Sequence, residues 1–170
     1  NMEETYLFVG NHQGNYDIPL IYTYSPIKMA FAAKEDLEKI PLIGSLMKQR
    51  GCIFLKKDNP RDSVLSINRG IEVLKSGESL CIFPEGKRTP DGAIGPARGG
   101  TAFLSWKCNV PVVPIALNGT YGKTLFDFFL RRINISIRIG KPIAPGDIVT
   151  VAEPQYEDFK NGAETIMKRV

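Results

Sequence analysis

The sequence contains a single histidine, His12, and three cysteines, of which no two have the CxxC spacing of a metal site. One imidazole and no closely spaced thiols do not supply the ligands of a structural zinc ion, so we expect no metal. Cys52 and Cys81 lie in apolar runs, and Cys108 ends a segment of helical spacing. Their odd number and apolar surroundings indicate buried, reduced thiols rather than a disulfide framework.

Long hydrophobic runs are also missing. No stretch is apolar for long enough to span a bilayer, and the first residues do not form a signal-peptide pattern. The chain starts at Asn1 without a methionine and reaches a strand-like segment, residues 6–9, almost at once. We therefore expect that a further segment precedes Asn1.

The charge has little excess of either sign. Lysine and arginine number 22, aspartate and glutamate number 18, and the net charge is +4. This mild excess permits an anionic substrate or an acidic membrane surface. It does not indicate a nucleic-acid module, because no stripe of interleaved basic and aromatic residues accompanies it. A length of 170 residues, 43% of them hydrophobic, predicts one domain, which we place at residues 1–170.

Short apolar runs, typical of buried strands, alternate with segments of helical spacing along the whole chain. This alternation predicts a layered α/β domain with a central mixed, largely parallel sheet flanked by helices. Strands are expected at residues 6–9, 28–33, 51–57, 80–83, from 112 onward and at 133–139, and helices at 18–25, 41–50, 60–76, 98–107 and 154–170.

Residues 10–17 connect the first expected strand to the first expected helix. His12 lies at the strand end, Asp17 lies in or near the first turn of the helix, and Asn15 is expected as the N-cap. If the chain folds back across this corner, the Asp17 carboxylate meets one imidazole nitrogen and leaves the other free to take a proton. A capping aspartate with a structural histidine beside a turn is the alternative, and both interpretations are open at this point.

Charged residues stand at the ends of two other expected strands. The basic pair at residues 56–57 ends one strand, and Glu85, Lys87 and Arg88 follow another. The carboxyl ends of parallel strands meet at one edge of a sheet, so these residues are candidates to share a cleft with the histidine. A base beside cations suits activation of a hydroxyl on a molecule whose phosphate the cations hold. The alternative is a set of solvated charges in which Glu85 pairs with Arg88, a contact that stabilises little.

Four motifs stand in one order along the chain. They are Asn11-His12 followed by four residues and Asp17, Gly-x-x-Phe-apolar-x-Lys at 51–57, Phe-Pro-Glu-Gly-x-Arg at 83–88 and Val-Pro-apolar-apolar-Pro at 110–114. Together they resemble the glycerolipid acyltransferase family, most closely the 1-acylglycerol-3-phosphate (lysophosphatidic acid) acyltransferases. Two positions depart from the family pattern: the usual arginine that ends the second motif is Lys57, and Lys87 stands where threonine is common.

The resemblance implies a glycerol-3-phosphate acyltransferase-like fold and a fatty acyl transfer in phospholipid biosynthesis. The donor would be acyl-CoA or acyl-carrier protein, the acceptor the free hydroxyl of 1-acylglycerol 3-phosphate, and the product phosphatidic acid. It implies no cofactor beyond this acyl donor. Glycerol 3-phosphate or another lysophospholipid as the acceptor, and a non-catalytic phospholipid-binding domain, are the alternatives.

The same resemblance assigns roles to individual residues. It makes His12 the general base and Asp17 the group that holds His12 in place. The residues that it assigns to the glycerol phosphate are Lys57, Glu85, Gly86 and Arg88. It also suggests that residues 112–115 shape the acyl site.

A lipid acceptor implies the cytoplasmic face of a membrane, with the chain bound peripherally or anchored by an N-terminal membrane-associated segment that precedes it. Residues 125–132 combine aromatic side chains with paired arginines, which favours either membrane contact or a core-packed helix with a basic end. The apolar residues of the 41–50 helix allow core packing or contact with lipid.

A thiol hydrolase that pairs His12 with Cys81 or Cys108 is the rival class of enzyme. A reactive thiol needs an accessible, electropositive site, whereas both cysteines lie in apolar patterns. We therefore expect neither cysteine to act as a nucleophile.

Overall fold

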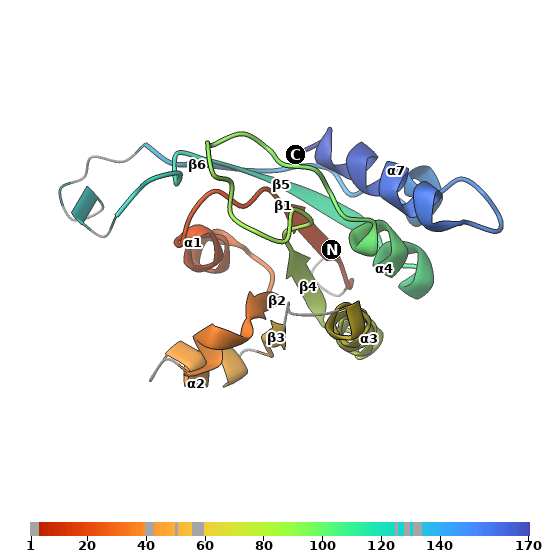
Figure 1. The fold of residues 1–170 in the computed structure, drawn as a ribbon, viewed down its shortest axis with the longest axis horizontal. Helices are drawn as coiled ribbons and strands as arrows, with labels where there is room; N and C mark the ends of the chain where they lie inside the picture. The colour runs from red at the N-terminus through yellow and green to blue at the C-terminus, as the bar shows by residue number, and fades with distance from the viewer. Residues whose placement is uncertain are drawn as a thin grey trace.

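The computed structural model describes residues 4–39, 43–49, 51–55, 60–124, 126–127, 130 and 134–170, in which strands and helices alternate (Figure 1). The strands are β1 (Leu7–Gly10), β2 (Met29–Lys34), β3 (Ile53–Leu55), β4 (Ser79–Ile82), β5 (Val112–Asn118) and β6 (Ser136–Ile139). The helices are α1 (Asp17–Tyr24), the 3-10 helix η1 (Glu35–Lys39), α2 (Ile43–Gln49), α3 (Pro60–Lys75), α4 (Gly100–Cys108), α6 (Pro145–Ile148) and α7 (Tyr156–Met167).

The strands form one six-stranded sheet in the order β3-β2-β4-β1-β5-β6. Neighbouring strands are parallel except β5 and β6, which are antiparallel. The predicted mixed, largely parallel sheet is therefore confirmed, and so is the place of β6 at an edge. Because β1 lies between β4 and β5, the carboxyl ends of these three strands meet at one edge of the sheet, where ligands of α/β proteins usually bind.

The strand register decides which loop residues meet at that edge. Val9 of β1 is opposite Ile82 of β4. His12 comes three residues after Val9, and Glu85 comes three residues after Ile82, so both leave the sheet at the same level. On the other side of β1, strand β5 continues to Asn118, and the turn that follows it reaches the same place. Three segments far apart in the sequence thus converge beside the histidine.

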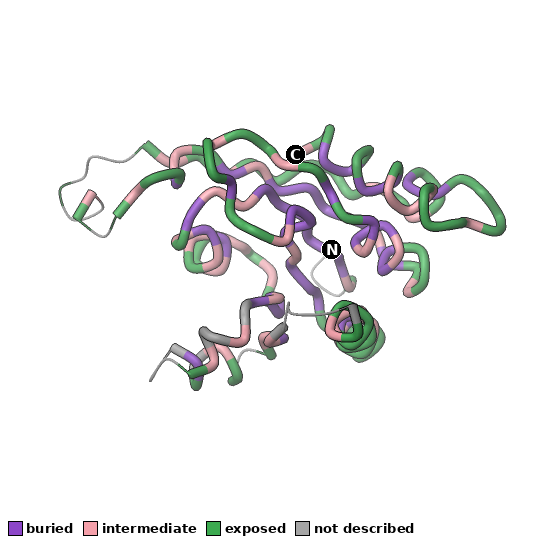
Figure 2. Tube along the Cα trace, viewed as in Figure 1, coloured by how far each residue is buried: buried purple, intermediate pink, exposed green. Residues whose placement is uncertain are grey.

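Side chains alternate between the two faces of the sheet, and two hydrophobic cores result. One core packs β1, β4 and β5 against α3, α4, α6 and α7, through residues such as Leu7, Leu80 and Val112. The other core contains Phe8, Phe31 and neighbouring residues together with Ile21 of α1. Figure 1 shows α3, α4 and α7 on one side of the sheet and α1 on the other, and Figure 2 shows buried residues along the central strands. The sheet is therefore packed on both faces, and this packing fixes the position of its carboxyl edge.

Three helix ends follow signals that are visible in the sequence. Helix α3 begins at Pro60, as predicted, because a proline at the start of a helix has no hydrogen bond to lose. The turn after α3 is closed by Gly77, whose φ of +86° lies in the left-handed region that favours glycine. A capping box of Gln155 and Asp158 starts α7.

One predicted cap is wrong. The residue at the N-cap of α1 is Tyr16, without a side-chain cap hydrogen bond, and not Asn15. The Asn15 side chain instead accepts a hydrogen bond from the Arg88 guanidinium. Helix α6 was not predicted, because it is only four residues long and begins at Pro145 in a loop-like sequence.

Part of the candidate membrane segment, residues 125, 128–129 and 131–132, lies outside the described residues, while Phe126 and Leu130 are exposed. The side chains of Leu42, Ile43 and Leu46 also lie outside the described part of the chain. Lipid contact by either segment therefore stays a prediction. Within the described ranges, no helix combines the length and the apolar character needed to cross a bilayer.

The core that packs α4 against α3 gives a stability prediction. Leu104 of α4 is 1% exposed, and a methyl group added at Gly70 of α3 would lie 3.2 Å from it. We expect Leu104→Ala to lower the free energy of unfolding by about 2–5 kcal/mol, because it leaves a cavity in a packed core. The matched control is Leu65→Ala on α3, where the side chain is 58% exposed and the loss should stay within about 0.5 kcal/mol. Urea unfolding measures both, and equal losses would contradict this account of the core.

Candidate active site

His12 and Asp17 are in direct contact. The imidazole Nδ1 lies 2.7 Å from the Asp17 carboxylate Oδ2, with 21% of the His12 side chain exposed and none of Asp17. The predicted meeting of the two side chains across the corner between β1 and α1 is therefore confirmed. With Nδ1 facing a carboxylate, the neutral ring keeps its proton on Nδ1 and leaves Nε2 as a proton acceptor.

The buried Asp17 carboxylate is held by donors from two parts of the chain. Oδ2 accepts hydrogen bonds from the backbone N–H groups of Gln13, at 2.7 Å, and Gly14, at 2.8 Å. Oδ1 accepts one from the Thr120 hydroxyl, at 2.6 Å. Hydrogen bonds to an ionised group offset the cost of removing it from water, and the first turn of a helix adds a favourable dipole. Asp17 can therefore carry a charge although it is buried.

Residues of the loop that follows strand β4 surround His12. The Phe83 ring stacks on the imidazole with a centroid separation of 4.3 Å and an interplanar angle of 14°. The His12 backbone N–H donates to Glu85 Oε1 at 2.8 Å, and its carbonyl accepts from the Thr89 N–H at 2.8 Å. One ring face and both backbone groups of His12 are thus fixed by the loop that follows β4.

The structure does not support the alternative in which Glu85 pairs with Arg88 as a solvated surface charge. Glu85 is 6% exposed, and its second oxygen, Oε2, accepts a hydrogen bond from the Gly95 N–H at 2.9 Å. Both carboxylate oxygens are therefore engaged by backbone donors, and among the described residues Glu85 forms no ion pair with Arg88. Sequence proximity suggested the pairing, but the loop turns Glu85 inward and Arg88 outward.

Gly86 makes this change of direction possible. Its φ is +69°, and its N–H donates to the Phe83 carbonyl at 3.0 Å, which closes a tight turn. A side chain at this position would also lie 3.2 Å from the Arg98 guanidinium carbon. A direct contact of Gly86 with substrate stays a prediction, and so does the role of Lys57, which lies outside the described residues.

A cavity of about 460 Å³ opens beside this corner. It is lined by Gln13, Gly14, Asn15, Lys87, Arg88, Thr89, Thr120, Tyr121, Gly122 and Lys123. Three of these residues, Gln13, Gly14 and Thr120, donate hydrogen bonds to Asp17. Three others, which we call the cationic wall, carry positive charge: Lys87, Arg88 and Lys123. The cavity thus joins the His12 corner to the cationic wall. The Gln13 side-chain oxygen is buried here and has no hydrogen-bond partner among the described residues.

Sequence reasoning missed two residues of this cavity, Thr120 and Lys123. Both lie in the glycine-containing turn that follows β5, and the topology brings this turn next to the end of β1. The signal available in the sequence was the position of the turn at the carboxyl end of a predicted strand. No local pattern linked it to His12, because Thr120 and Asp17 are 103 residues apart.

The three cysteines do not form a second catalytic site. All three are free, and Cys81 is completely buried in β4. Burial raises the pKa of the Cys81 thiol, and desolvation also raises the pKa of Cys52 and of Cys108. Since the thiolate is the nucleophilic form, a raised pKa removes reactivity at neutral pH. The thiol-hydrolase alternative is therefore disfavoured.

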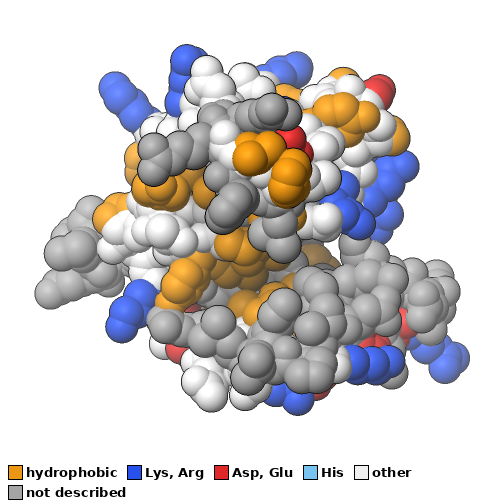
Figure 3. Space-filling view, turned by 90° about the vertical axis from the view of Figure 1, so that its left-hand side faces the viewer, with side chains coloured by type: hydrophobic (Ala, Val, Ile, Leu, Met, Phe, Trp, Pro, Cys, Tyr) orange, Lys and Arg blue, Asp and Glu red, His pale blue; other side chains and the backbone are white. Residues whose placement is uncertain are grey.

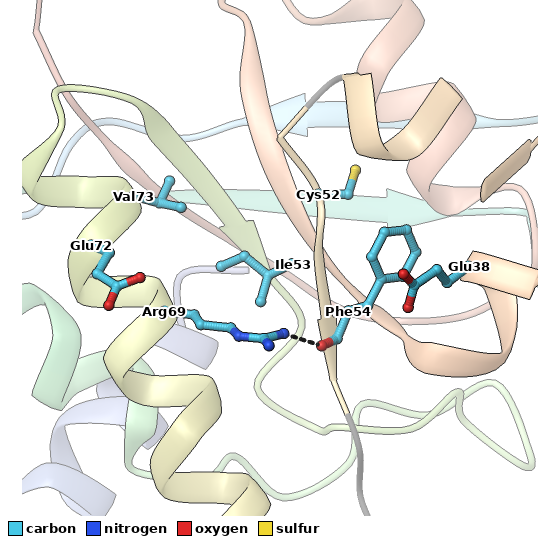
Figure 4. A pocket seen from close by; sticks show the side chains of 7 residues that line it. All are labelled: Glu38, Cys52, Ile53, Phe54, Arg69, Glu72 and Val73. Carbon is cyan, nitrogen blue, oxygen red and sulfur yellow. Dashed lines mark hydrogen bonds between the residues drawn. The ribbon is translucent and has the colours of Figure 1, made fainter. Parts of the chain in front are cut away.

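A second cavity, of about 360 Å³, lies at the other edge of the sheet, between β3 and α3 (Figure 4). Figure 4 shows Arg69 reaching from α3 to the carbonyl of Phe54, to which it donates a hydrogen bond of 2.9 Å. Glu38 and Glu72 also line this cavity, and two carboxylates do not favour an anionic ligand. The cavity beside His12 is the better candidate for a phosphate.

Hydrophobic side chains gather in a hollow on the face of the molecule that lies at the left of Figure 1 (Figure 3). Helix α1, which begins at Asp17, lies on this side of the sheet (Figure 1). The last residue of α1, Tyr24, is 70% exposed. Apolar surface of this kind is typical of contact with lipid or with another macromolecule.

Known proteins resemble this chain along most of its length. A model of the family described as Acyltransferase matches residues 1–118, which include the His12 corner and the loop after β4. The chloroplastic 1-acyl-sn-glycerol-3-phosphate acyltransferase of Brassica napus is 37% identical over 142 residues, or 81% of this chain and 40% of that protein. The 1-acyl-sn-glycerol-3-phosphate acyltransferase of Saccharomyces cerevisiae is 30% identical over 84% of this chain and 48% of that protein.

A solved structure shows the same architecture. The crystal structure of the 1-acyl-sn-glycerophosphate (LPA) acyltransferase PlsC from Thermotoga maritima matches with a TM-score of 0.76 and 29% sequence identity. The match covers 99% of this chain and 66% of that one, so the chain spans about two thirds of this structure and less than half of the two relatives above. The family model covers well over half of the 170 residues, and the fold agrees with it: the chain belongs to the acyltransferase family.

Proposed function

We propose that this chain is the catalytic part of a 1-acyl-sn-glycerol-3-phosphate acyltransferase. The observation that supports this most is the His12–Asp17 pair, at 2.7 Å, beside a cavity with a cationic wall. Activation of a hydroxyl requires the first feature, and recognition of a phosphate on the same molecule requires the second. The relatives from Brassica napus, Saccharomyces cerevisiae and Thermotoga maritima are named as acyltransferases for this acceptor, which supports the same choice here.

The proposed reaction is a direct transfer. Nε2 of His12 removes the proton of the acceptor hydroxyl while the oxygen attacks the carbonyl carbon of an acyl thioester. The C–O bond forms, the C–S bond breaks, and the departing thiolate takes the proton from the imidazolium. Asp17 holds the ring and stabilises its positive charge, and general-base help of this kind contributes roughly 10²- to 10⁴-fold. A thiol with a pKa near about 8.5 leaves without a strong general acid.

The acceptor phosphate is proposed to lie against Lys87, Arg88 and Lys123. Arg88 is held by the Asn15 side-chain oxygen, which still leaves donors of its planar guanidinium for a phosphate. Glu85 serves this site indirectly, since it fixes the backbone of His12 and the loop at Gly95. Acyl-CoA and acyl-carrier protein are both candidate donors, and no cofactor beyond the donor is proposed.

A membrane surface is part of the proposal, because acceptor and product are lipids. The hydrophobic hollow of Figure 3 and the exposed Tyr24 support contact with lipid chains near the site. We place the protein at the cytoplasmic face of a membrane, bound peripherally or through a segment outside this chain. Its net charge of +4 favours attraction to anionic headgroups.

Product analysis tests the proposed reaction. The full-length protein is incubated in mixed micelles with acyl-CoA or acyl-carrier protein as the donor. The acceptors are 1-acylglycerol 3-phosphate, glycerol 3-phosphate and a lysophospholipid with a larger headgroup. We expect phosphatidic acid as the main product. His12→Ala should abolish it, and Asp17→Asn should lower kcat by about 10²- to 10⁴-fold, because the ring loses its fixed tautomer.

Circular dichroism and urea unfolding show whether these variants remain folded. A folded His12→Ala protein that transfers acyl groups at a near-normal rate would contradict the proposed base. Binding of 1-acylglycerol 3-phosphate by a wild-type protein that transfers nothing from either donor would favour a non-catalytic lipid-binding domain.

The cationic wall gives a prediction about selectivity. Arg88→Ala should raise KM for 1-acylglycerol 3-phosphate by about 10- to 100-fold, because a charge-assisted hydrogen bond contributes about 1.5–3 kcal/mol. The matched control is Lys75→Ala at the C-terminal end of α3, away from the cavity, where KM should not change. KM for monoacylglycerol, which lacks the phosphate, should be the same in both variants as in the wild type. A rise in KM that is the same for both acceptors would contradict a phosphate contact.

A further inference from the structure

Thr120 lies outside the four motifs yet makes a direct contact with the proposed catalytic pair. It follows β5, is completely buried, and donates its hydroxyl hydrogen to Asp17 Oδ1 at 2.6 Å. In the described part of the chain no other group donates to this oxygen. The two oxygens of Asp17 are thus held from opposite sides: Oδ2 by the His12 corner and Oδ1 by Thr120.

The backbone around Thr120 is built to hold this position. Gly119 has a φ of +92°, and a side chain there would meet the Asn134 carbonyl at 2.0 Å, so only glycine fits. This turn directs Thr120 inward, where its own carbonyl packs against Gly14. A methyl group added at Gly14 would lie 2.6 Å from that carbonyl, so the two backbones approach as closely as glycine allows. The turn after β5 is therefore packed closely against the loop that contains His12.

From this geometry we infer that Thr120 is a positioning residue for the general base. Its hydroxyl prevents the Asp17 carboxylate from rotating and keeps Oδ2 directed at Nδ1 of His12. Nδ1 then retains its proton, and Nε2 stays free to accept one from the substrate. The catalytic consequence rests on the proposed function, whereas the effect on the His12 tautomer does not.

Three variants separate this role from a general effect on packing. Thr120→Val replaces the hydroxyl with a methyl group of similar shape, and Thr120→Ser keeps the hydroxyl. Thr101→Val is the matched control, because the Thr101 hydroxyl is also buried but has no partner among the described residues. Removal of a hydroxyl without a hydrogen bond should leave the active site unchanged.

Nitrogen-15 NMR of the histidine ring measures the tautomer directly, since His12 is the only histidine of the chain and gives one set of signals. We expect the Nδ1–H tautomer in the wild type, in Thr120→Ser and in Thr101→Val. Thr120→Val should show a mixture of both neutral tautomers. A Thr120→Val protein that is folded and keeps the wild-type ring signals would overturn the inference, whether or not the protein transfers acyl groups.

Steady-state kinetics supplies the second measurement. Thr120→Val should lower kcat about 10-fold, as expected for loss of one hydrogen bond to a charged group, with KM for donor and acceptor within about twofold of wild type. Thr120→Ser should restore most of kcat. A rise in KM for the acceptor with kcat unchanged would mean that Thr120 contacts substrate and would overturn the positioning role. Absence of transfer by the wild type would instead refute the proposed function, and the ring signals would still decide the role of Thr120.

Discussion

The site depends on one buried charge. The Asp17 carboxylate is fully removed from solvent, which is costly unless its oxygens receive hydrogen bonds. Four groups meet this requirement: the His12 ring, two backbone N–H groups of residues 13–14, and the Thr120 hydroxyl. Because these donors come from the segments that follow β1 and β5 at one edge of the sheet, satisfying one carboxylate also fixes the geometry of the whole corner.

The parallel sheet brings the remaining parts to this corner. Strands β4 and β5 flank β1, so the loops that follow them lie on either side of His12. The loop after β4 contributes the Phe83 ring, the Glu85 carboxylate that binds the His12 backbone, and the cations. The turn after β5 contributes Thr120 and Lys123. The proposed base and the proposed phosphate site thus combine segments that are separate in sequence but adjacent at one sheet edge, where ligands of α/β proteins usually bind.

Much of this arrangement could be predicted from the sequence, and the failures have a physical pattern. Alternating strands and helices follow from hydrophobic periodicity, and the His12–Asp17 contact follows from a local corner of five residues. Thr120 could not be found in this way, because its contact depends on strand order. The Asn15 cap prediction failed, and the alternative pairing of Glu85 with Arg88 was not borne out, for a related reason: both assumed that polar neighbours in sequence pair locally. In the folded chain Glu85 binds distant backbone groups, and Asn15 binds Arg88.

Carbethoxylation by diethyl pyrocarbonate tests whether the free nitrogen of the His12 imidazole performs the proposed reaction. This reagent acylates an unprotonated imidazole nitrogen, and the chain offers one histidine, whose side chain is 21% exposed. Mass spectrometry of the labelled peptide is compared with the rate of acyl transfer at each stage of modification. If Nε2 of His12 is the base, the acyl-transfer activity should fall in proportion to the labelling of His12, and 1-acylglycerol 3-phosphate should slow both the labelling and the loss of activity. A protein that is fully labelled at His12 and still transfers acyl groups at its original rate would show that this nitrogen is not the base.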